Sequence, residues 1–228
     1  MNPGVFVTGT DTGCGKTWLS VELIRQLRGQ GLRVAGFKPV AAGAAMRDGN
    51  LVNDDALALA EAGGLDIPYA TINPYCFAPP IAPHLAAAEV RVRVGIGPIR
   101  VAFNEVVGCS DFVVVEGAGG WRVPLGPGLD MQSLALELGL PVLLVVGLRL
   151  GCINHALLSE QAILTSGARL LGWVGAQVDP GMASLNENIA TLDSALSRPC
   201  LGILPHPGAL NAPDREFPLD LRGVLAGA

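Results

Sequence analysis

The sequence predicts an α/β protein in which helices cover both faces of a doubly wound, mostly parallel central sheet. Short apolar runs alternate with amphipathic ones along the chain, which is typical of strand–helix–strand units. Two of these runs, 112–115 and 142–146, are apolar without alternation, as strands buried on both faces are. Ligands of such sheets bind beyond the carboxyl ends of the strands, so polar residues at those ends are the candidates for function.

The first half of the chain supplies three of the predicted strands. Residues 5–8 form the first strand, and a helix over 17–29 follows because leucine recurs every four residues from Leu19 to Leu27. Gly31 ends that helix. The next elements in order are a strand at 33–38, helices at 54–62 and 99–107, and a strand at 111–116.

In the second half, Asp130 is the predicted N-cap of a helix that runs through Leu138. Later elements are a strand at 142–146, a helix at 154–166, a strand at 170–178, a helix at 183–196 and a strand at 201–204. The segment 68–83 has no regular pattern and is either a lid or an insertion, and 206–228 is unplaced. Because we find no linker and no internal repeat, we expect residues 1–228 to form one domain.

The composition excludes several classes of protein. Half of the 228 residues are hydrophobic and 15% are charged, which excludes extensive disorder. A net charge of −5 with scattered basic residues argues against binding nucleic acid or an anionic membrane, and no apolar run is long enough to span a bilayer. Five cysteines without close pairs indicate free thiols, and the start of the chain lacks the basic lead of a signal peptide. A cytoplasmic protein is therefore expected.

The most informative motif is a glycine-rich turn after the first strand, Gly9-Thr10-Asp11-Thr12-Gly13-Cys14-Gly15-Lys16-Thr17. Backbone N–H groups of such a turn and of the following helix converge on a phosphate. Lys16 would supply positive charge to the outer phosphates, and the Thr17 hydroxyl would bind Mg²⁺. Five residues separate Gly9 from Gly15 instead of four, so the motif is a variant, and a purely structural turn is the alternative.

Three charged residues lie near the ends of strands or the start of a helix. Glu116 ends its strand where a carboxylate can reach Mg²⁺, and an acid that only faces water is the alternative. The glycines that follow it let the backbone approach a ligand closely. Asp55 is either a third magnesium contact or a first-turn carboxylate that complements the helix dipole. Lys38 would neutralise a substrate or transition-state anion, unless it is simply solvated.

Other polar residues lie in two loops. Within the glycine-rich turn, Thr12 is expected to hydrogen-bond a second substrate and Asp11 to orient Lys16 or a metal-bound water. After the strand at 142–146, Asn154 caps the next helix, or the backbone of its loop binds substrate instead. Cys152 and the neighbouring histidine are not expected to act as nucleophile and base, because no acidic residue lies nearby in the sequence to orient them.

Six motifs then occur in order: Gly9-Thr10-Asp11-Thr12 with Gly15-Lys16-Thr17, Phe37-Lys38-Pro39-Val40, Asp55-Ala56-Leu57, Glu116-Gly117-Ala118-Gly119-Gly120-Trp121, Leu150-Gly151-Cys152-Ile153-Asn154-His155 and Gly172-Trp173-Val174. Together they resemble the dethiobiotin synthetase family over about residues 4–205. The resemblance implies a phosphate-loop NTPase fold and a homodimeric, Mg²⁺- and ATP-dependent enzyme of biotin biosynthesis. The implied reaction joins CO₂ to 7,8-diaminononanoate, phosphorylates the carbamate with ATP, and lets the second amine close the ureido ring.

By this similarity, Lys16 holds the phosphates, Lys38 holds the carbamate and the transferred phosphoryl group, and Thr12 meets the diamine. Thr17, Asp55 and Glu116 would bind the metal. The other implied nucleotide contacts are Gly13, Cys14, Gly15, Trp18, Gly117, Ala118, Gly119, Ala176, Gln177, Pro205, His206 and Pro207. The other implied substrate contacts are Ala42 and, donated across the dimer, Gly151, Cys152 and Asn154.

The sequence departs from the family pattern in four ways. Ala42 replaces a substrate-contacting serine, and Arg149 replaces a lysine, which keeps the charge but alters its reach. Ala176-Gln177 replaces an Asn-Asp pair expected to read adenine, so weaker discrimination of the base is expected. Gly13 replaces a glutamate and is expected to loosen the loop.

Two other hypotheses stay open at the level of sequence. A phosphate-loop partitioning or scaffold ATPase would dimerise on ATP and bind a surface. Such proteins usually carry a second lysine early in the loop, where this chain has Thr10. A relative that binds nucleotide but has lost synthesis is the other hypothesis, motivated by Ala42 and Ala176.

Overall fold

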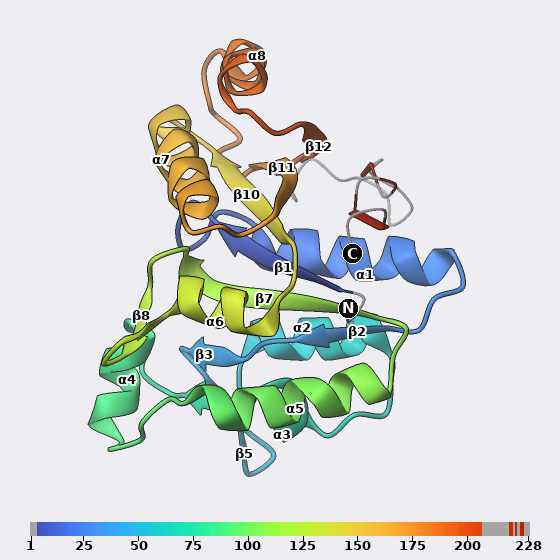
Figure 1. Ribbon diagram of the computed structural model, residues 1–228, viewed down its shortest axis with the longest axis vertical. Coiled ribbons are helices and arrows are strands. Elements are labelled where there is room, and N and C mark those ends of the chain that lie inside the picture. The colour runs from blue at the N-terminus through green and yellow to red at the C-terminus, as the bar shows by residue number, and fades with distance from the viewer. Residues whose placement is uncertain (1–3, 207–218, 221, 223, 226–228) are drawn as a thin grey trace.

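In the computed structural model the central sheet has six strands, and all of their pairings are parallel. The strands are β1 (Gly4–Gly9), β2 (Val34–Phe37), β7 (Phe112–Gly120), β10 (Val142–Leu148), β11 (Leu170–Gln177) and β12 (Cys200–Leu204). They lie in the order β12-β11-β10-β1-β7-β2 (Figure 1). The structure describes residues 4–206, 219, 220, 222, 224 and 225.

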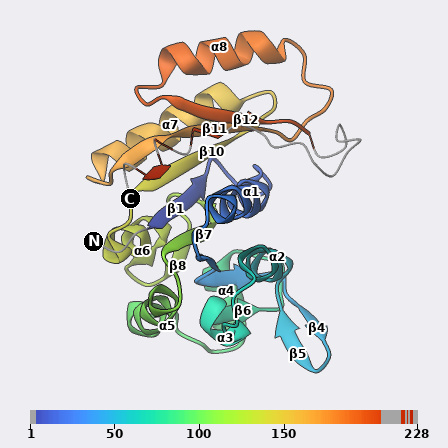
Figure 2. The ribbon, with the colours of Figure 1, turned by 90° about the vertical axis from the view of Figure 1, so that its right-hand side faces the viewer.

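Helices cover both faces of the sheet, as Figure 2 shows. On one face lie α1 (Lys16–Gly29) and α2 (Asp54–Gly63). On the other lie α5 (Ile96–Gly108), α6 (Met131–Leu138) and α7 (Cys152–Thr165), with α8 (Leu185–Ala195) packed beside α7. The predicted α/β class and its doubly wound sheet are therefore confirmed.

Each face of the sheet buries its own hydrophobic core. Successive residues of β7 point to opposite faces, so Phe112 and Val114 join the core under α1 and α2. Val113 and Val115 join the core under α5, α6 and α7. This two-sided burial is why the run is apolar without alternation.

The order of the strands reverses at β1. From β1 the chain crosses to β2 and returns to β7, and only then does it build β10, β11 and β12 on the other side. Open parallel sheets bind ligands outside the carboxyl ends of their strands at such a reversal. The glycine-rich turn, which follows β1, lies there.

Short elements near β2 were missed by the sequence analysis. The segment 68–83, expected to be irregular, contains α3 (Tyr69–Ile72) and β6 (Tyr75–Phe77) and reaches the first residue of α4 (Pro83–Glu89). β6 pairs in parallel with β3 (Val40–Ala42). Two hairpins were also missed: β4 (Ala45–Arg47) with β5 (Asn50–Val52), and β8 (Pro124–Gly126) with β9 (Leu129–Asp130). Elements of two to four residues are too short to show a period.

Three further details correct or extend the expectations. α7 begins at Cys152 with Gly151 as its N-cap, so the expectation that Asn154 caps this helix is wrong. Asp130 is the N-cap of α6 as predicted, and its side chain accepts a hydrogen bond from Ser133 N. Part of the unplaced C-terminal segment is described, and there Val224 is buried in the core beside α1.

Among the described residues, no helix is both long enough and apolar enough to cross a bilayer.

Candidate functional site

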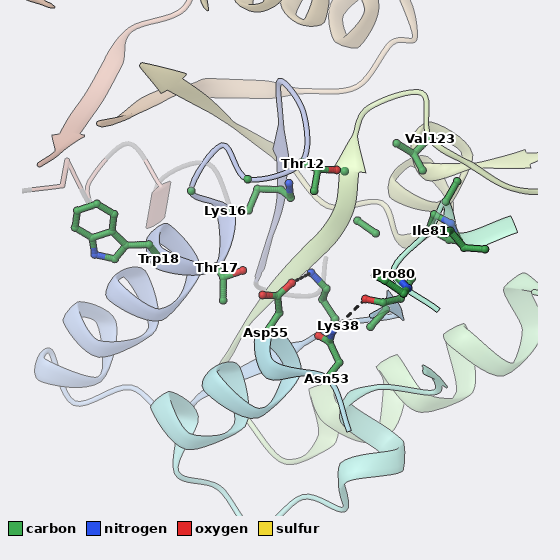
Figure 3. Close-up of a pocket in the computed structure, with 18 residues that line it drawn as sticks. Thr12, Lys16, Thr17, Trp18, Lys38, Asn53, Asp55, Pro80, Ile81 and Val123 are labelled. Atoms are coloured by element: carbon green, nitrogen blue, oxygen red, sulfur yellow. Dashed lines mark hydrogen bonds and ion pairs between the residues drawn. The ribbon is translucent and has the colours of Figure 1, made fainter. Parts of the chain in front are cut away.

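A cavity of about 710 Å³ lies at the carboxyl ends of β1, β2 and β7 (Figure 3). Its lining includes many of the residues expected from sequence: Thr12, Gly13, Gly15, Lys16, Thr17, Trp18, Lys38, Ala42, Asp55, Ala118 and Gly119. It also includes residues that the sequence analysis missed: Ala41, Asn53, Pro80, Ile81, Ala82, Pro83 and Val123. The glycine-rich turn of residues 9–17, which is the phosphate loop of this chain, therefore meets the end of β2 and the start of α2 around one cavity.

The phosphate loop is held tightly at its second half. Gly15, the N-cap of α1, has a φ of 97°, and a Cβ there would lie 2.6 Å from the Cβ of Ala176. Only glycine fits such a conformation against β11. Cys14, also expected to contact the nucleotide, is fully buried and is not part of the cavity lining in the described residues. Lys16 Nζ donates to the backbone oxygen of Asp11 at 2.8 Å, so the lysine is folded onto its own loop.

The chemical centre of the cavity is a buried cation between two carboxylates. Lys38 Nζ lies 2.8 Å from Asp55 Oδ2 and 2.6 Å from Glu116 Oε1 (Figure 3 shows the contact with Asp55). Thr17 Oγ1 donates to the same Glu116 oxygen at 2.9 Å. Glu116 is fully buried, so the alternative of a strand-end acid in water is wrong, as is that of a solvated Lys38.

Lys38 and Asp55 keep each other ionised. Burial opposes the charge of Lys38, but Glu116 and Asp55 outweigh it and hold the pKa of the ammonium above its ordinary value. Burial likewise opposes ionisation of Asp55, but the charge and hydrogen bond of Lys38 hold the pKa of this carboxyl below its ordinary 3.8. Ionised Asp55 therefore stabilises the fold above pH 3.8, and this contribution is lost as the pH falls through its lower folded pKa.

The oxygen atoms of the cluster fit a hard divalent cation. Glu116 Oε2 is buried and has no hydrogen-bond partner among the residues that the structure describes, so one carboxylate oxygen is left to accept a ligand. The Thr17 hydroxyl and the half-buried Asp55 carboxylate lie beside it. Carboxylate and hydroxyl oxygens shared with phosphates and water suit Mg²⁺.

The end of β7 passes close to the phosphate loop. Gly119 has a φ of +64°, and a Cβ there would lie 2.8 Å from Val123 Cγ2 and 3.5 Å from Thr12 Oγ1. β7 continues to Gly120, which is paired with Gly9. The glycines after Glu116 therefore let β7 pack against the phosphate loop. As a result, Thr12 and Ala118 line the same cavity.

The residues expected at the nucleotide base lie at the ends of β11 and β12. Ala176 is fully buried against Gly15, and Gln177 Oε1 accepts a hydrogen bond from His206 N at 3.3 Å. In Figure 3, Trp18 points away from Lys38 and Asp55. Pro207, another implied nucleotide contact, lies outside the described residues.

The loop before α7 contacts the phosphate loop through an ion pair between Arg149 and Asp11. Asp11 thus holds Lys16 through its backbone oxygen and Arg149 through its carboxylate. Gly151, Cys152 and Asn154 do not line the cavity of their own chain in the part that the structure describes. Cys152 is buried, whereas Asn154 is exposed.

Comparisons with known proteins agree with this geometry. A family model described as an AAA domain matches residues 3–214. The chain is 50% identical over 226 residues to the ATP-dependent dethiobiotin synthetase BioD of Pseudomonas aeruginosa strain LESB58, which covers 99% of each chain. It is 48% identical over 201 residues to that of Xylella fastidiosa strain M12, covering 88% of this chain and 89% of the other.

Solved structures share the fold at much lower sequence identity. The MinC:MinD cell division protein complex of Aquifex aeolicus matches with a TM-score of 0.58 and 15% identity, covering 99% of this chain and 86% of the other. A likeness at that identity shows a common fold and nothing of the function.

The ion cluster makes a prediction about stability. We expect Lys38→Met to lower the free energy of unfolding by about 3 kcal/mol, because buried Glu116 and Asp55 would lose their shared cation. Urea denaturation at neutral pH measures the change. Lys16→Met is the matched control, since Lys16 is also buried but its ammonium bonds to a backbone oxygen. Equal losses in the two variants would contradict the prediction.

Proposed function

Because this chain belongs to the ATP-dependent dethiobiotin synthetase family, we propose that its cavity is where ATP activates a carbamate of 7,8-diaminononanoate and the ureido ring closes. The chain is a ligase of biotin biosynthesis that forms carbon–nitrogen bonds at the expense of ATP. The observation that carries the proposal is the buried Lys38 ammonium beside the phosphate loop, within bonding distance of two carboxylates.

The chemistry requires a site that gathers anions. A carbamate formed from CO₂ and an amine is a poor electrophile, and its phosphorylation creates a leaving group that the second amine displaces. Both steps spread negative charge over oxygen atoms, and a protein promotes them mainly by position and by fixed positive charge. Lys16 and Lys38 are the two lysines that line the cavity in the described part of the chain.

We assign these two lysines to different partners. Lys16 follows the glycine-rich turn and leaves Asp11 to bind the outer phosphates of ATP. Lys38, at the end of β2, binds the carbamate and the transferred phosphoryl group. Thr17, Asp55 and Glu116 would hold Mg²⁺, which would neutralise phosphate charge.

The substrates and the base are placed around these charges. Thr12 contacts the diamine from the phosphate loop, and Ala42 faces the same cavity without a hydroxyl to offer it. We place the nucleotide base beside Ala176 and Gln177, where the ends of β11 and β12 adjoin the phosphate loop. With alanine at 176, the backbone and Gln177 are left to contact the base, so we propose a loose preference for adenine.

We propose a homodimer in which the loop before α7 completes the site of the other subunit. Leu150 is 93% exposed, and Leu157 and Leu158 on α7 are also exposed. On α7, Leu157 and Leu158 follow Asn154 at helical spacing, and Leu150 lies in the turn just before the helix; an exposed apolar patch of this kind marks a surface for association. We also place the enzyme in the cytoplasm, where its five free cysteines stay reduced.

The reaction itself is the first prediction of this proposal. Incubation with 7,8-diaminononanoate, bicarbonate, Mg²⁺ and ATP should yield a diamine-dependent product that carries one added carbonyl, detected by mass spectrometry. ATP hydrolysis that proceeds equally without the diamine, and without product, would overturn the assignment. That outcome would favour a relative that has lost synthesis.

The two lysines should fail in different ways. Lys16→Ala should lower turnover by roughly 10²–10³, because one preorganised charge contact to the phosphates is lost. Lys38→Ala should retain ATP binding, measured by calorimetry, while product formation disappears. A parallel loss of ATP affinity and product in Lys38→Ala would contradict its assignment to the carbamate.

A shared site predicts complementation between subunits. Lys38→Met removes the carbamate contact of its own site, and Asn154→Asp puts a negative charge in the first turn of α7, which would be donated with its loop to the partner's site. Each homodimer should be nearly inactive. Mixed dimers, isolated by two different affinity tags, should regain about half of the wild-type activity because one of the two sites is intact. Inactive mixed dimers would show that the loop serves its own chain.

A further inference from the structure

We infer that Tyr69 and Asn73 are positioning residues that fix Lys38 and Asp55 relative to each other through one hydroxyl. Among the described residues, neither lines the cavity, and the hydrogen bonds of both lead to other groups than the side chains of Lys38 and Asp55. They act by holding the backbones next to Asp55 and at Lys38. This inference rests on the proposed role of Lys38.

The first connection leads from Tyr69 to the helix that carries Asp55. Asn53 is the N-cap of α2, and its side chain accepts a hydrogen bond from Ala56 N. Its own N–H donates to Tyr69 Oη at 2.8 Å. A glutamate or glutamine three residues after the cap often receives such an N–H, but this chain has Ala56 there. The tyrosine of α3 replaces that local partner and so ties the start of α2 to α3.

The second connection leads from Tyr69 to Lys38. Tyr69 Oη donates to Asn73 Oδ1 at 3.0 Å. Asn73 is buried, and its Nδ2 donates to the backbone oxygen of Lys38 at 2.6 Å and to that of Tyr75 at 3.1 Å. Lys38 N donates to the backbone oxygen of Ile72 at 2.9 Å. Both backbone polar groups of Lys38 are therefore bound by residues 72 and 73.

Three hydrogen bonds agree on which way the Asn73 amide points. A side-chain amide has one acceptor and one donor end, and two backbone oxygens require the donor end. Tyr69 supports this orientation because its proton needs the acceptor end. Burial, the main cause, raises the pKa of the Tyr69 hydroxyl above its ordinary value, so the hydroxyl keeps its proton. The thiol of Cys76 also lies 3.7 Å from Oη.

These connections make a closed circuit with the ion pair. Lys38 Nζ reaches Asp55 Oδ2 at 2.8 Å, while behind them Asn73, Tyr69 and Asn53 join the two backbones. Asn53 Nδ2 also donates to the backbone oxygen of Ala42, at the substrate side of the cavity. Loss of the hydroxyl would leave the buried N–H of Asn53 and the Oδ1 of Asn73 without their partner, and it would break the link between α2 and the amide that holds the Lys38 backbone.

The test is Tyr69→Phe in the full-length enzyme, with Tyr75→Phe as the matched control. The chain has two tyrosines, both half-buried, and the hydroxyl of Tyr75 accepts from Gly95 N, away from Lys38. We expect Tyr69→Phe to lower kcat at least about tenfold with the KM for ATP changed less than about twofold, because displaced reacting groups affect the chemical step. The ratio of ADP to dethiobiotin should rise, and Tyr75→Phe should change none of these.

Two outcomes would overturn the inference. One is a Tyr69→Phe enzyme that matches Tyr75→Phe in kcat and in the ADP ratio. The other is a loss of kcat accompanied by an equal loss of ATP affinity and a lower melting temperature, as a purely structural role predicts. Lys38→Met separates this failure from that of the proposed function, since product that persists without Lys38 would contradict its role independently of Tyr69.

A double-mutant cycle tests whether the two residues act together. If Tyr69 acts through the Asn73 amide, then Tyr69→Phe should add little to the defect of Asn73→Ala. Defects that multiply would show separate effects and overturn the shared path. Should Asn73→Ala fail to fold, the kcat and the ADP ratio of Tyr69→Phe decide alone, because this variant keeps the aromatic ring in its place.

Discussion

The site depends on one buried ammonium that lies between two carboxylates. Taking Lys38, Asp55 and Glu116 out of water is costly, and their mutual attraction compensates only while all three stay at bonding distance. This constraint couples β2, α2 and β7, which supply one member each. It also leaves the site able to bind a cation. The three ions are paired with one another, but Glu116 Oε2 has no hydrogen-bond partner among the described residues.

The residues that bear the chemistry could be predicted from sequence because they lie in short local patterns. Lys16 and Thr17 close a glycine-rich turn, and Lys38 follows the apolar run of β2. Glu116 follows the apolar run of β7, but the prediction that it ends the strand is wrong, because β7 continues to Gly120. The residues that hold these side chains in place could not be predicted in this way. Asn53, Tyr69 and Asn73 act through contacts between elements of which α3 and β6 are four and three residues long. Such short elements show no hydrophobic periodicity in the sequence. Their hydrogen bonds form only when segments distant in the sequence pack together.

The structure shows what two of the residues that depart from the family pattern contact. Arg149 pairs with Asp11, whose backbone oxygen holds Lys16, so the charge before α7 is joined to the phosphate loop. Ala176 packs against Gly15, where space is limited by the loop itself. The start of α7 was predicted two residues late, because glycine at an N-cap gives a weaker signal than asparagine.

The pairing of β1 has a consequence for how the protein is made. Phe6 lies opposite Val115 on one side and Val142 on the other, so the strand that bears the phosphate loop is completed by partners synthesised much later. Parallel strands cannot pair before the crossover between them exists. On the ribosome, the first strand must therefore wait as an unpaired apolar segment until most of the chain has emerged. Until those partners are made, the exposed strand is a site at which nascent chains can aggregate.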